Sequence, residues 1–261
     1  MISDILAPVA LSNHGPHLSP IVAGAWRMAE WGMNVEHRVR WIEKCLDLGI
    51  TSFDHADIYG GYTVETLFGE ALAAQPSLRS RMQLVTKCGI KLVSKQRPRH
   101  SIKSYDTSRA HVMASVDASL RAMHTDHIDL LLVHRPDALM DPDELANTFE
   151  DLRAAGKVLH FGVSNHTPSQ LALLNKRIGL CTNQIELSPL HLNAISDGTL
   201  DQCLDLGIRP MIWSPLAGGR LFNAGDEVAQ RVRTVLEDLG RRHQVSLATM
   251  AYAWILRHPC R

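Results

Sequence analysis

The sequence lacks an excess of charge of either sign. Its 261 residues include 27 Lys and Arg against 27 Asp and Glu, so the formal net charge is zero. A strongly basic protein would attract nucleic acid or an anionic membrane surface. We therefore expect neither nucleic acid nor a membrane as a partner.

Long apolar runs and clustered cysteines are also lacking. No apolar run approaches the roughly 20 residues that span a bilayer. The N-terminus has an acid at Asp4, an early Pro8 and no basic segment, so it does not resemble a signal peptide. The cysteines are odd in number, and none belongs to a C-x-x-C motif: Cys45, Cys88, Cys181, Cys203 and Cys260. Reduced thiols in a cytoplasmic protein are expected.

The sequence also gives no pattern for a metal site. Its 14 histidines include pairs such as His14 with His17 and His124 with His127. No cysteine accompanies these pairs at the spacing of zinc ligands. We expect no metal.

Strand-like and helix-like segments alternate along the whole chain. The predicted strands lie at 20–25, 50–55, 82–87, 127–133, 158–163, 180–185 and 208–213. The predicted helices lie at 35–48, 64–74, 108–123, 142–155, 197–206, 226–242 and 246–257, with one more after Thr167. The alternation predicts a single parallel α/β barrel domain over residues 1–261. We expect 89–107 to be a long basic loop and 4–19 to form a hairpin.

Ionisable side chains end three consecutive predicted strands. Asp54 is followed closely by Tyr59, and Lys87 and His134 end the next two strands. The active site of an α/β barrel lies at the C-terminal ends of its strands. There, a Lys ammonium would lower the pKa of the Tyr phenol, and an Asp would keep the Lys charged. With His134 holding the substrate oxygen, Tyr59 could protonate a carbonyl as hydride arrives at carbon.

Each of these residues also has an ordinary explanation. Tyr59 suits a loop aromatic at the core edge, and Asp54 suits a helix or turn cap. Lys87 could extend its amine from a barrel end, and His134 could be a hydrogen-bonded core residue. Their joint position at three neighbouring strand ends favours the active site.

The later strands predict a cofactor site. Ser164, Asn165 and Gln184 offer neutral donors and acceptors suited to a carboxamide, and Trp213 offers a face for a planar ring. The loop SPLAGGR at 214–220 combines small residues with one arginine, which suits a pyrophosphate. A tight turn that needs glycine would explain the same loop.

Several motifs together resemble the aldo-keto reductase family. They are FDHADIYGGYTVETLFGEAL, LVTKCG, LLLVHRP, GVSN, TNQIELSP and WSPLAGGRL. The resemblance extends from about residue 20 to residue 257 and is strongest to bacterial cytoplasmic oxidoreductases with a DHADIYGGY motif. It implies a (β/α)8 TIM barrel that binds NADPH in extended form. In agreement, the sequence has no G-x-G-x-x-G, P-loop or G-x-S-x-G motif.

The resemblance also implies a role for each matched residue. Tyr59 would be the general acid, tuned by Lys87 and Asp54, and His134 would orient the carbonyl.

The resemblance likewise implies which residues bind the cofactor. Ser164, Asn165 and Gln184 would hold the nicotinamide carboxamide, and Trp213 would stack on the ring. The pyrophosphate would lie along Ser214, Leu216 and Arg220. Apart from the resemblance, Trp26 and Trp31 lie after the first strand and could line the mouth of the substrate pocket, although ordinary loop packing explains them equally well.

The sequence departs from the family pattern at its C-terminal end. It stops at RHPCR, where family members continue for about one more βα unit. That unit carries the last strand, its helix and the segment that grips the adenosine 2′-phosphate. We therefore expect a C-terminally incomplete barrel, and NADH stays open as an alternative to NADPH.

The main functional prediction is an NADP-dependent aldo-keto reductase. It would reduce small aldehydes or ketones to alcohols as a cytoplasmic monomer or weak homo-oligomer. One alternative is a slow NADP(H)-binding sensor or auxiliary subunit of the same fold. Another is a Schiff-base enzyme with Lys87 as nucleophile, which requires a lowered lysine pKa that Asp54 opposes.

Overall fold

A parallel sheet of seven strands forms the centre of the molecule. The computed structural model describes residues 7–223 and 225–260. The strands follow the order β11-β10-β9-β8-β5-β4-β3, and every neighbouring pair is parallel. Their bounds are β3 Ala23–Gly24, β4 Ser52–Asp54, β5 Gln83–Cys88, β8 Ile128–Val133, β9 Val158–Ser164, β10 Asn183–Glu186 and β11 Met211–Trp213. This is the order of a (β/α)8 barrel with seven of its units among the described residues.

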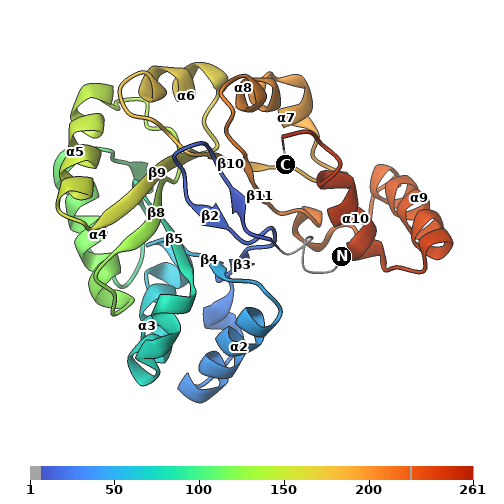
Figure 1. Cartoon of the computed structure of the whole chain (residues 1–261), viewed down its shortest axis with the longest axis horizontal. Helices are drawn as coiled ribbons and strands as arrows, with labels where there is room; N and C mark the ends of the chain where they lie inside the picture. Colours follow the sequence, from blue (N-terminus) through green and yellow to red (C-terminus); the bar gives the residue numbers. More distant parts are fainter. Residues whose placement is uncertain (1–6, 224, 261) are drawn as a thin grey trace.

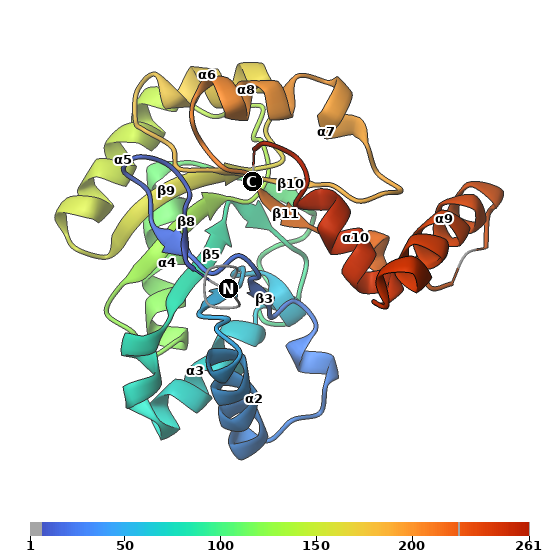
Figure 2. The same cartoon turned by 45° about the vertical axis from the view of Figure 1, so that its right-hand side comes forward.

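Helices cover the outside of the sheet in an arc (Figure 1). They are α2 Val35–Asp47, α3 Val64–Ala74, α4 Arg109–Ala122, α5 Pro142–Ala154, α6 Pro168–Asn175, α7 Asn193–Ser196, α8 Thr199–Asp205, α9 Glu227–His243 and α10 Leu247–Ile255. Short 3-10 turns lie at η1 Met28–Glu30, η2 Tyr59–Gly61, η3 Pro76–Arg81 and η4 Ala217–Gly219. Helix α9 packs on α10 and extends away from the arc (Figure 2). None of the described helices is long and apolar enough to cross a membrane.

Local capping signals fix where several helices begin. The Ser108 side chain accepts a hydrogen bond from the N–H of His111 at the start of α4. Asp141 caps α5, with Pro142 in its first turn. Thr167 opens α6 in a capping box with Gln170. Because these signals lie within a few residues of each helix end, the predicted starts of these helices are confirmed.

A short N-terminal hairpin lies inside the curve of the sheet (Figure 1). Strands β1 Val9–Ala10 and β2 His17–Leu18 pair antiparallel, within the predicted 4–19 hairpin; residues 4–6 are outside the described part. Leu11 and Leu18 pack with inward side chains of the sheet, including Leu130 and Met211. The hairpin therefore packs against the inner face of the sheet.

Several predicted segments differ in detail from the structure; β11, for example, spans Met211–Trp213, whereas we expected a strand over 208–213. Strand β3 pairs only over Ala23–Gly24, whereas we expected a strand over 20–25. The stretch 89–107 is not wholly irregular, since β6 Ile90–Lys91 and β7 Ser104–Tyr105 form a small antiparallel hairpin. The helix expected at 197–206 begins later, at α8, because Gly198 adopts a left-handed conformation with φ 86° before it.

The first and last strands of the sheet order, β3 and β11, are its edges. Each has one partner strand, β4 and β10 respectively, in the described part of the chain. A large cavity lies between these edges, and its wall includes residues of both strands. The space inside the curved sheet is therefore open between β3 and β11 as well as at the C-terminal ends of the strands.

Candidate active site

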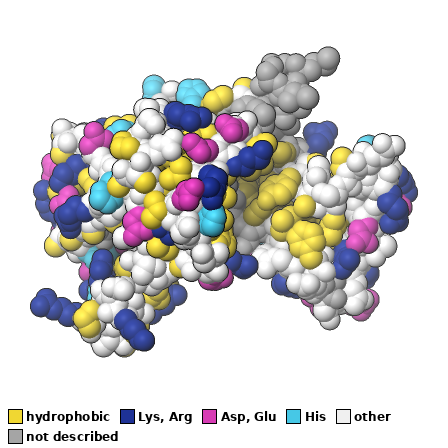
Figure 3. All heavy atoms as spheres, turned by 90° about the horizontal axis from the view of Figure 1, so that it is seen from below, with side chains coloured by type: hydrophobic (Ala, Val, Ile, Leu, Met, Phe, Trp, Pro, Cys, Tyr) yellow, Lys and Arg dark blue, Asp and Glu magenta, His cyan; other side chains and the backbone are white. Residues whose placement is uncertain are grey.

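One cavity of about 1500 Å³ joins the strand ends to the gap between β3 and β11. Hydrophobic side chains line a hollow between the body of the molecule and the part that carries α9 and α10 (Figure 3). Most of the residues that the sequence predicted for the site line this cavity: Trp26, Trp31, Asp54, Tyr59, His134, Ser164, Asn165, Gln184, Trp213, Ser214 and Leu216. The strand ends therefore bring together residues that are far apart in the sequence.

Lys87 joins the predicted proton donor to its predicted partner. Its Nζ donates to Asp54 Oδ2 at 2.7 Å, to the backbone oxygen of His55 at 2.7 Å and to the Tyr59 hydroxyl at 3.1 Å. Its three ammonium hydrogens thus have three acceptors. Lys87 is fully enclosed, with 1% of its side chain exposed, while Asp54 retains access to the cavity.

Backbone geometry brings Tyr59 to this position. Asp54 ends β4, and Tyr59 begins η2 five residues later. Gly60 and Gly61 follow with φ of 59° and 66°, a conformation that favours glycine. A Cβ on Gly60 would lie 2.7 Å from Thr63 Oγ1 and 2.9 Å from a Val64 methyl. The YGGY sequence therefore sets the sharp turn that points the phenol at Lys87.

The pKa of Lys87 reflects two opposing effects. Burial alone would lower the pKa of its ammonium, but the negative charge of Asp54 and the hydrogen bonds to Asp54 and Tyr59 raise it above the usual value. Lys87 is therefore positively charged at neutral pH. A Schiff-base nucleophile needs the neutral amine, so this geometry disfavours that alternative.

The pKa of Tyr59 differs from the sequence-based expectation. Burial raises the pKa of Tyr59 above its usual value of 10.0, and this effect outweighs the lowering by the Lys87 and Arg135 charges. The expectation of a net lowering was wrong for the protein alone, because desolvation of the phenolate was not visible in the sequence. Tyr59 is therefore protonated at neutral pH.

His134 stands beside Tyr59 as a neutral imidazole. The two rings meet edge to face, with centroids 6.0 Å apart. Burial, followed by the charges of Lys87, Arg135 and Lys103, lowers the pKa of His134 to about 2. Its Nδ1 is buried without a hydrogen-bond partner, while the residue itself lines the cavity. A neutral ring that faces the cavity can exchange a hydrogen bond with a bound oxygen.

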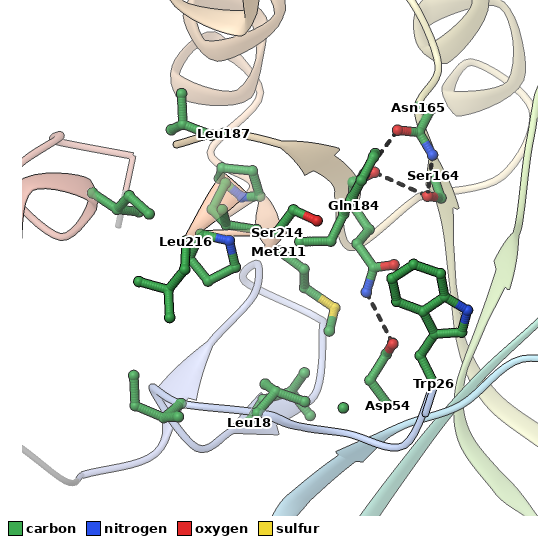
Figure 4. A pocket seen from close by; sticks show the side chains of 18 of the residues that line it. Leu18, Trp26, Asp54, Ser164, Asn165, Gln184, Leu187, Met211, Ser214 and Leu216 are labelled. Atoms are coloured by element: carbon green, nitrogen blue, oxygen red, sulfur yellow. Dashed lines mark hydrogen bonds between the residues drawn. The ribbon is translucent and has the colours of Figure 1, made fainter. Parts of the chain in front are cut away.

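The predicted carboxamide residues form one connected network (Figure 4). Asn165 Nδ2 donates to Ser164 Oγ at 2.7 Å, and Ser164 Oγ donates to the Gln184 backbone oxygen at 3.0 Å. Gln184 Nε2 donates to Asp54 Oδ1 at 2.9 Å. Trp213 Nε1 donates to Asn165 Oδ1 at 3.0 Å. Hydrogen bonds at the ends of β9, β10 and β11 thus fix the orientation of the Asn165 and Gln184 side-chain amides. The same bonds link these amides to the Asp54–Lys87 pair.

The loop after β11, which the sequence predicts to bind pyrophosphate, is only partly at the cavity. Ser214 and Leu216 line it, and Ser214 and Ala217 hold left-handed φ values of 51° and 53°, which are costly for residues with a side chain. Arg220 is not among the lining residues, because its guanidinium is paired with Asp226 at 2.8 Å on the surface. The structure therefore does not bring Arg220 to the other predicted cofactor residues.

The two predicted pocket tryptophans differ in environment. Trp26 is 57% exposed, and its ring lies 6.5 Å from the Tyr59 ring. Trp31 lines the cavity from further out and packs against Trp41 at 5.2 Å. Trp26 can thus contact a molecule that reaches Tyr59, whereas Trp31 is partly engaged in loop packing.

Two features of the site were missed from the sequence. The bond from Gln184 to Asp54 depends on strands that are distant in the chain, and no local pattern predicts it. Arg135 directly follows His134 and holds its guanidinium 5.6 Å from the centre of the Trp213 ring. Because the HRP motif places this arginine directly after His134, the sequence could have indicated that Arg135 lies near the site.

Comparison with known proteins gives consistent matches along most of the chain. The model of the "Aldo/keto reductase family" matches residues 20–261. The uncharacterized oxidoreductase YcsN of Bacillus subtilis is 50% identical over 244 residues, covering 92% of this chain and 81% of its own. The oxidoreductase YdhF of Escherichia coli is 48% identical over 254 residues, covering 96% and 84%.

Two further matches carry a named activity or a solved fold. A 6-dehydroglucose reductase of Agrobacterium fabrum is 43% identical over 258 residues, covering 97% of this chain and 85% of its own. The structure of a glycerol dehydrogenase from Gluconobacter oxydans superposes with a TM-score of 0.82 at 24% identity, covering 98% and 84%. The structural match establishes the barrel fold.

Proposed function

This chain belongs to the aldo/keto reductase family, and we propose that it reduces aldehydes or ketones with NADPH, using Tyr59 as the proton donor. One observation carries the proposal. The Tyr59 hydroxyl lies 3.1 Å from a Lys87 ammonium that is itself paired with Asp54, at the edge of a cavity lined by His134 and by amide side chains. This arrangement can protonate a carbonyl oxygen that is bound in the cavity.

The residues around the cavity fit a nicotinamide nucleotide. The cavity has a volume of about 1500 Å³, which includes the gap between β3 and β11, so it has room for a nucleotide together with a substrate. Asn165 and Gln184 would hold the carboxamide, and Ser214 and Leu216 would lie along the pyrophosphate. When bound, the cofactor supplies hydride; the protein supplies orientation and the proton.

Two side chains would have to adapt when the cofactor binds. One face of Trp213 is covered by the Arg135 guanidinium, so the nicotinamide would use the other face or displace Arg135. Arg220 would reach a phosphate only after leaving Asp226, an exposed ion pair that costs little to break. Both movements are confined to exposed or half-buried side chains.

Four polar residues would each have a role in the proton transfer: Tyr59, His134, Lys87 and Asp54. The carbonyl oxygen would accept hydrogen bonds from the Tyr59 hydroxyl and from His134. As the phenol gives up its proton, the neighbouring Lys87 ammonium stabilises the developing phenolate charge. Asp54 keeps Lys87 charged and fixed, and its own second oxygen is held by Gln184.

A titration with nucleotide and an assay of turnover test the proposal. Purified protein is titrated with NADPH and, separately, with NADH by fluorescence, and reduction of an aromatic aldehyde is followed from oxidation of the nucleotide. We expect saturable NADPH binding with turnover. Because two relatives are named 6-dehydroglucose reductases, that aldehyde joins the assay set. NADPH binding without turnover would instead favour the sensor alternative.

Replacing Tyr59 by Phe tests the assigned proton donor. Tyr59→Phe removes the hydroxyl and keeps the ring, so we expect the turnover number to fall about 10²–10⁴-fold while NADPH affinity is nearly unchanged. Tyr62→Phe is the matched control, because the Tyr62 hydroxyl contacts Ile90 and Leu92 in the neighbouring loop. Reduction at the wild-type rate in Tyr59→Phe would show that another group donates the proton.

A further inference from the structure

The cavity carries positive charge that no carboxylate in its wall balances. Among its described lining residues, the arginines and lysines are Arg27, Lys103, Arg135 and Arg209. The single carboxylate in that lining is Asp54. Asp54 is already engaged, because Lys87 binds its Oδ2 and Gln184 binds its Oδ1. The cavity is therefore cationic although the whole chain is neutral.

Arg135 has no acidic partner in the described part of the chain. Its recorded contact is the face of Trp213, at 5.6 Å from the ring centre. Neither it nor Lys103 belongs to any of the ion pairs found among the described residues. By contrast, Lys91 of the same loop as Lys103 faces Asp106 at 3.4 Å. Arg135 and Lys103 thus line the cavity without a carboxylate partner among the described residues.

These charges lie close to the proposed reaction centre. Arg135 follows His134 at the end of β8 and is half-buried. Its charge acts on both Tyr59 and His134, and that of Lys103 acts on His134. Trp26 and Trp213 bound the space near them with apolar faces. A ligand whose carbonyl contacts Tyr59 and His134 would therefore meet the guanidinium a short distance away.

Given the proposed reductase function, on which this step rests, we propose that the natural substrate is an anionic carbonyl compound whose carboxylate is bound by Arg135, with Lys103 adding positive charge at the mouth. A guanidinium presents paired N–H donors that match the two oxygens of a carboxylate. In a half-buried site this pair is stronger than one on the open surface. Arg135 then selects among carbonyl compounds without taking part in proton transfer.

A matched pair of substrates tests the proposal directly. 4-Formylbenzoate and its methyl ester present the same aromatic aldehyde, with and without the negative charge. We expect kcat/KM to be at least about tenfold higher for the acid in the wild-type protein. Arg135→Met should remove this preference, lowering kcat/KM for the acid about 10–100-fold and for the ester less than about threefold. Arg135→Lys should retain part of it.

Arg97→Met is the matched control variant. Arg97 also stacks on an aromatic ring, that of Tyr62 at 4.6 Å, but it is not among the residues that line the cavity. It should leave the acid-to-ester ratio unchanged. Lys103→Met should lower the ratio by a smaller factor than Arg135→Met, because Lys103 is exposed.

Two results would overturn the assignment while leaving the reductase function intact. One is an equal or higher kcat/KM for the ester in the wild-type protein. The other is a rise in the KM for NADPH in Arg135→Met with an unchanged acid-to-ester ratio, which would assign the guanidinium to the phosphates of the cofactor. If neither aldehyde is turned over, the proposed function fails instead. Quenching of tryptophan fluorescence by 4-formylbenzoate then decides the anion site: binding lost in Arg135→Met supports it, and binding unaffected by that change refutes it.

Discussion

At the scale of single residues, the site depends on one buried charge with three acceptors. Lys87 is enclosed and is held by Asp54, Tyr59 and the His55 carbonyl. Removing one member of such a buried ion pair costs free energy of folding, because the remaining charge stays in a poorly solvated environment. The same bonds that hold the Tyr59 hydroxyl, the proposed proton donor, therefore also contribute to the stability of the strand ends.

Replacing Lys87 should affect stability as well as activity. Lys87→Met leaves the Asp54 carboxylate without its main partner, and we expect the free energy of unfolding to fall by about 3–5 kcal/mol. The double change Lys87→Met with Asp54→Asn removes both charges and should recover part of that loss. Denaturant unfolding of the two variants and the wild type measures the difference. Equal stability of the single and double variants would contradict the coupling.

The pH dependence of reduction should reflect Tyr59 rather than His134. With its pKa raised above 10.0, the phenol stays protonated as the pH rises through neutrality. His134, with a pKa of about 2, stays neutral in the same range. We expect kcat for reduction to be flat from about pH 6 to 9 and to fall only at more alkaline pH. A decline centred near neutral pH would assign the proton donor to a different group.

At the scale of elements, helices α3 and α4 pack closely because of one glycine. A Cβ on Gly69 would lie 1.9 Å from the backbone oxygen of Ala122, at the end of α4. Backbone at this position cannot move without displacing the whole helix. The contact thus requires glycine, although alanine is the better helix former by about 1 kcal/mol.

Gly69→Ala should therefore destabilise the protein. We expect the overpacking cost, about 1–3 kcal/mol or more, to exceed the gain in helix propensity. Gly179→Ala is a suitable control, since nothing lies within 4 Å of a Cβ added there. Thermal unfolding of both variants measures the outcome. A Gly69→Ala protein as stable as the wild type would mean that α4 shifts freely against α3.

The starts of the helices with side-chain caps were predictable from the sequence, whereas strand lengths were not. Ser108, Asp141 and Thr167 cap their helices through bonds within three residues, so the sequence contains the whole signal. Strand β3, by contrast, extends only as far as β4 pairs with it, and that partner lies about 30 residues away. The strand ends are therefore set by tertiary pairing.

The same distinction holds for the candidate site. The order of Asp54, Lys87 and His134 on successive strands predicted that they would meet, because parallel strands end at one edge. The sequence could not predict that Arg220 would pair with Asp226, or that burial would outweigh Lys87 in setting the pKa of Tyr59. Both depend on the surroundings of a side chain rather than on its place in a motif.

At the scale of the whole molecule, buried histidines link stability to pH. Burial, together with the Lys87 charge, lowers the pKa of His55 to about 3, and burial lowers that of His166 to about 4. Both pKa values are below the unfolded value of 6.5. The unfolded chain therefore binds more protons, and stability is lost as the pH falls from about 6.5 towards the folded values.

His55→Leu should weaken this acid sensitivity. The change removes one group that takes up a proton on unfolding, so the slope of unfolding free energy with pH should decrease by about 1.4 kcal/mol per pH unit below pH 6. Phe68→Leu, which alters the ring that packs on His55 at 4.4 Å, should lower stability without changing that slope. Denaturant unfolding at pH 7, 6 and 5 distinguishes them, and an unchanged slope in His55→Leu would contradict the assignment.

The hydrogen bond between Gln184 and Asp54 also has a consequence for the order in which the molecule folds. It joins residues 130 positions apart, whereas β8 and β9 pair across a single helical connection. Contacts between distant parts of a chain form slowly, because a long loop must be closed before they are gained. The local βα units can thus assemble while the polar network is still open. A refolding chain would recover its helical signal first and its capacity to bind nucleotide last.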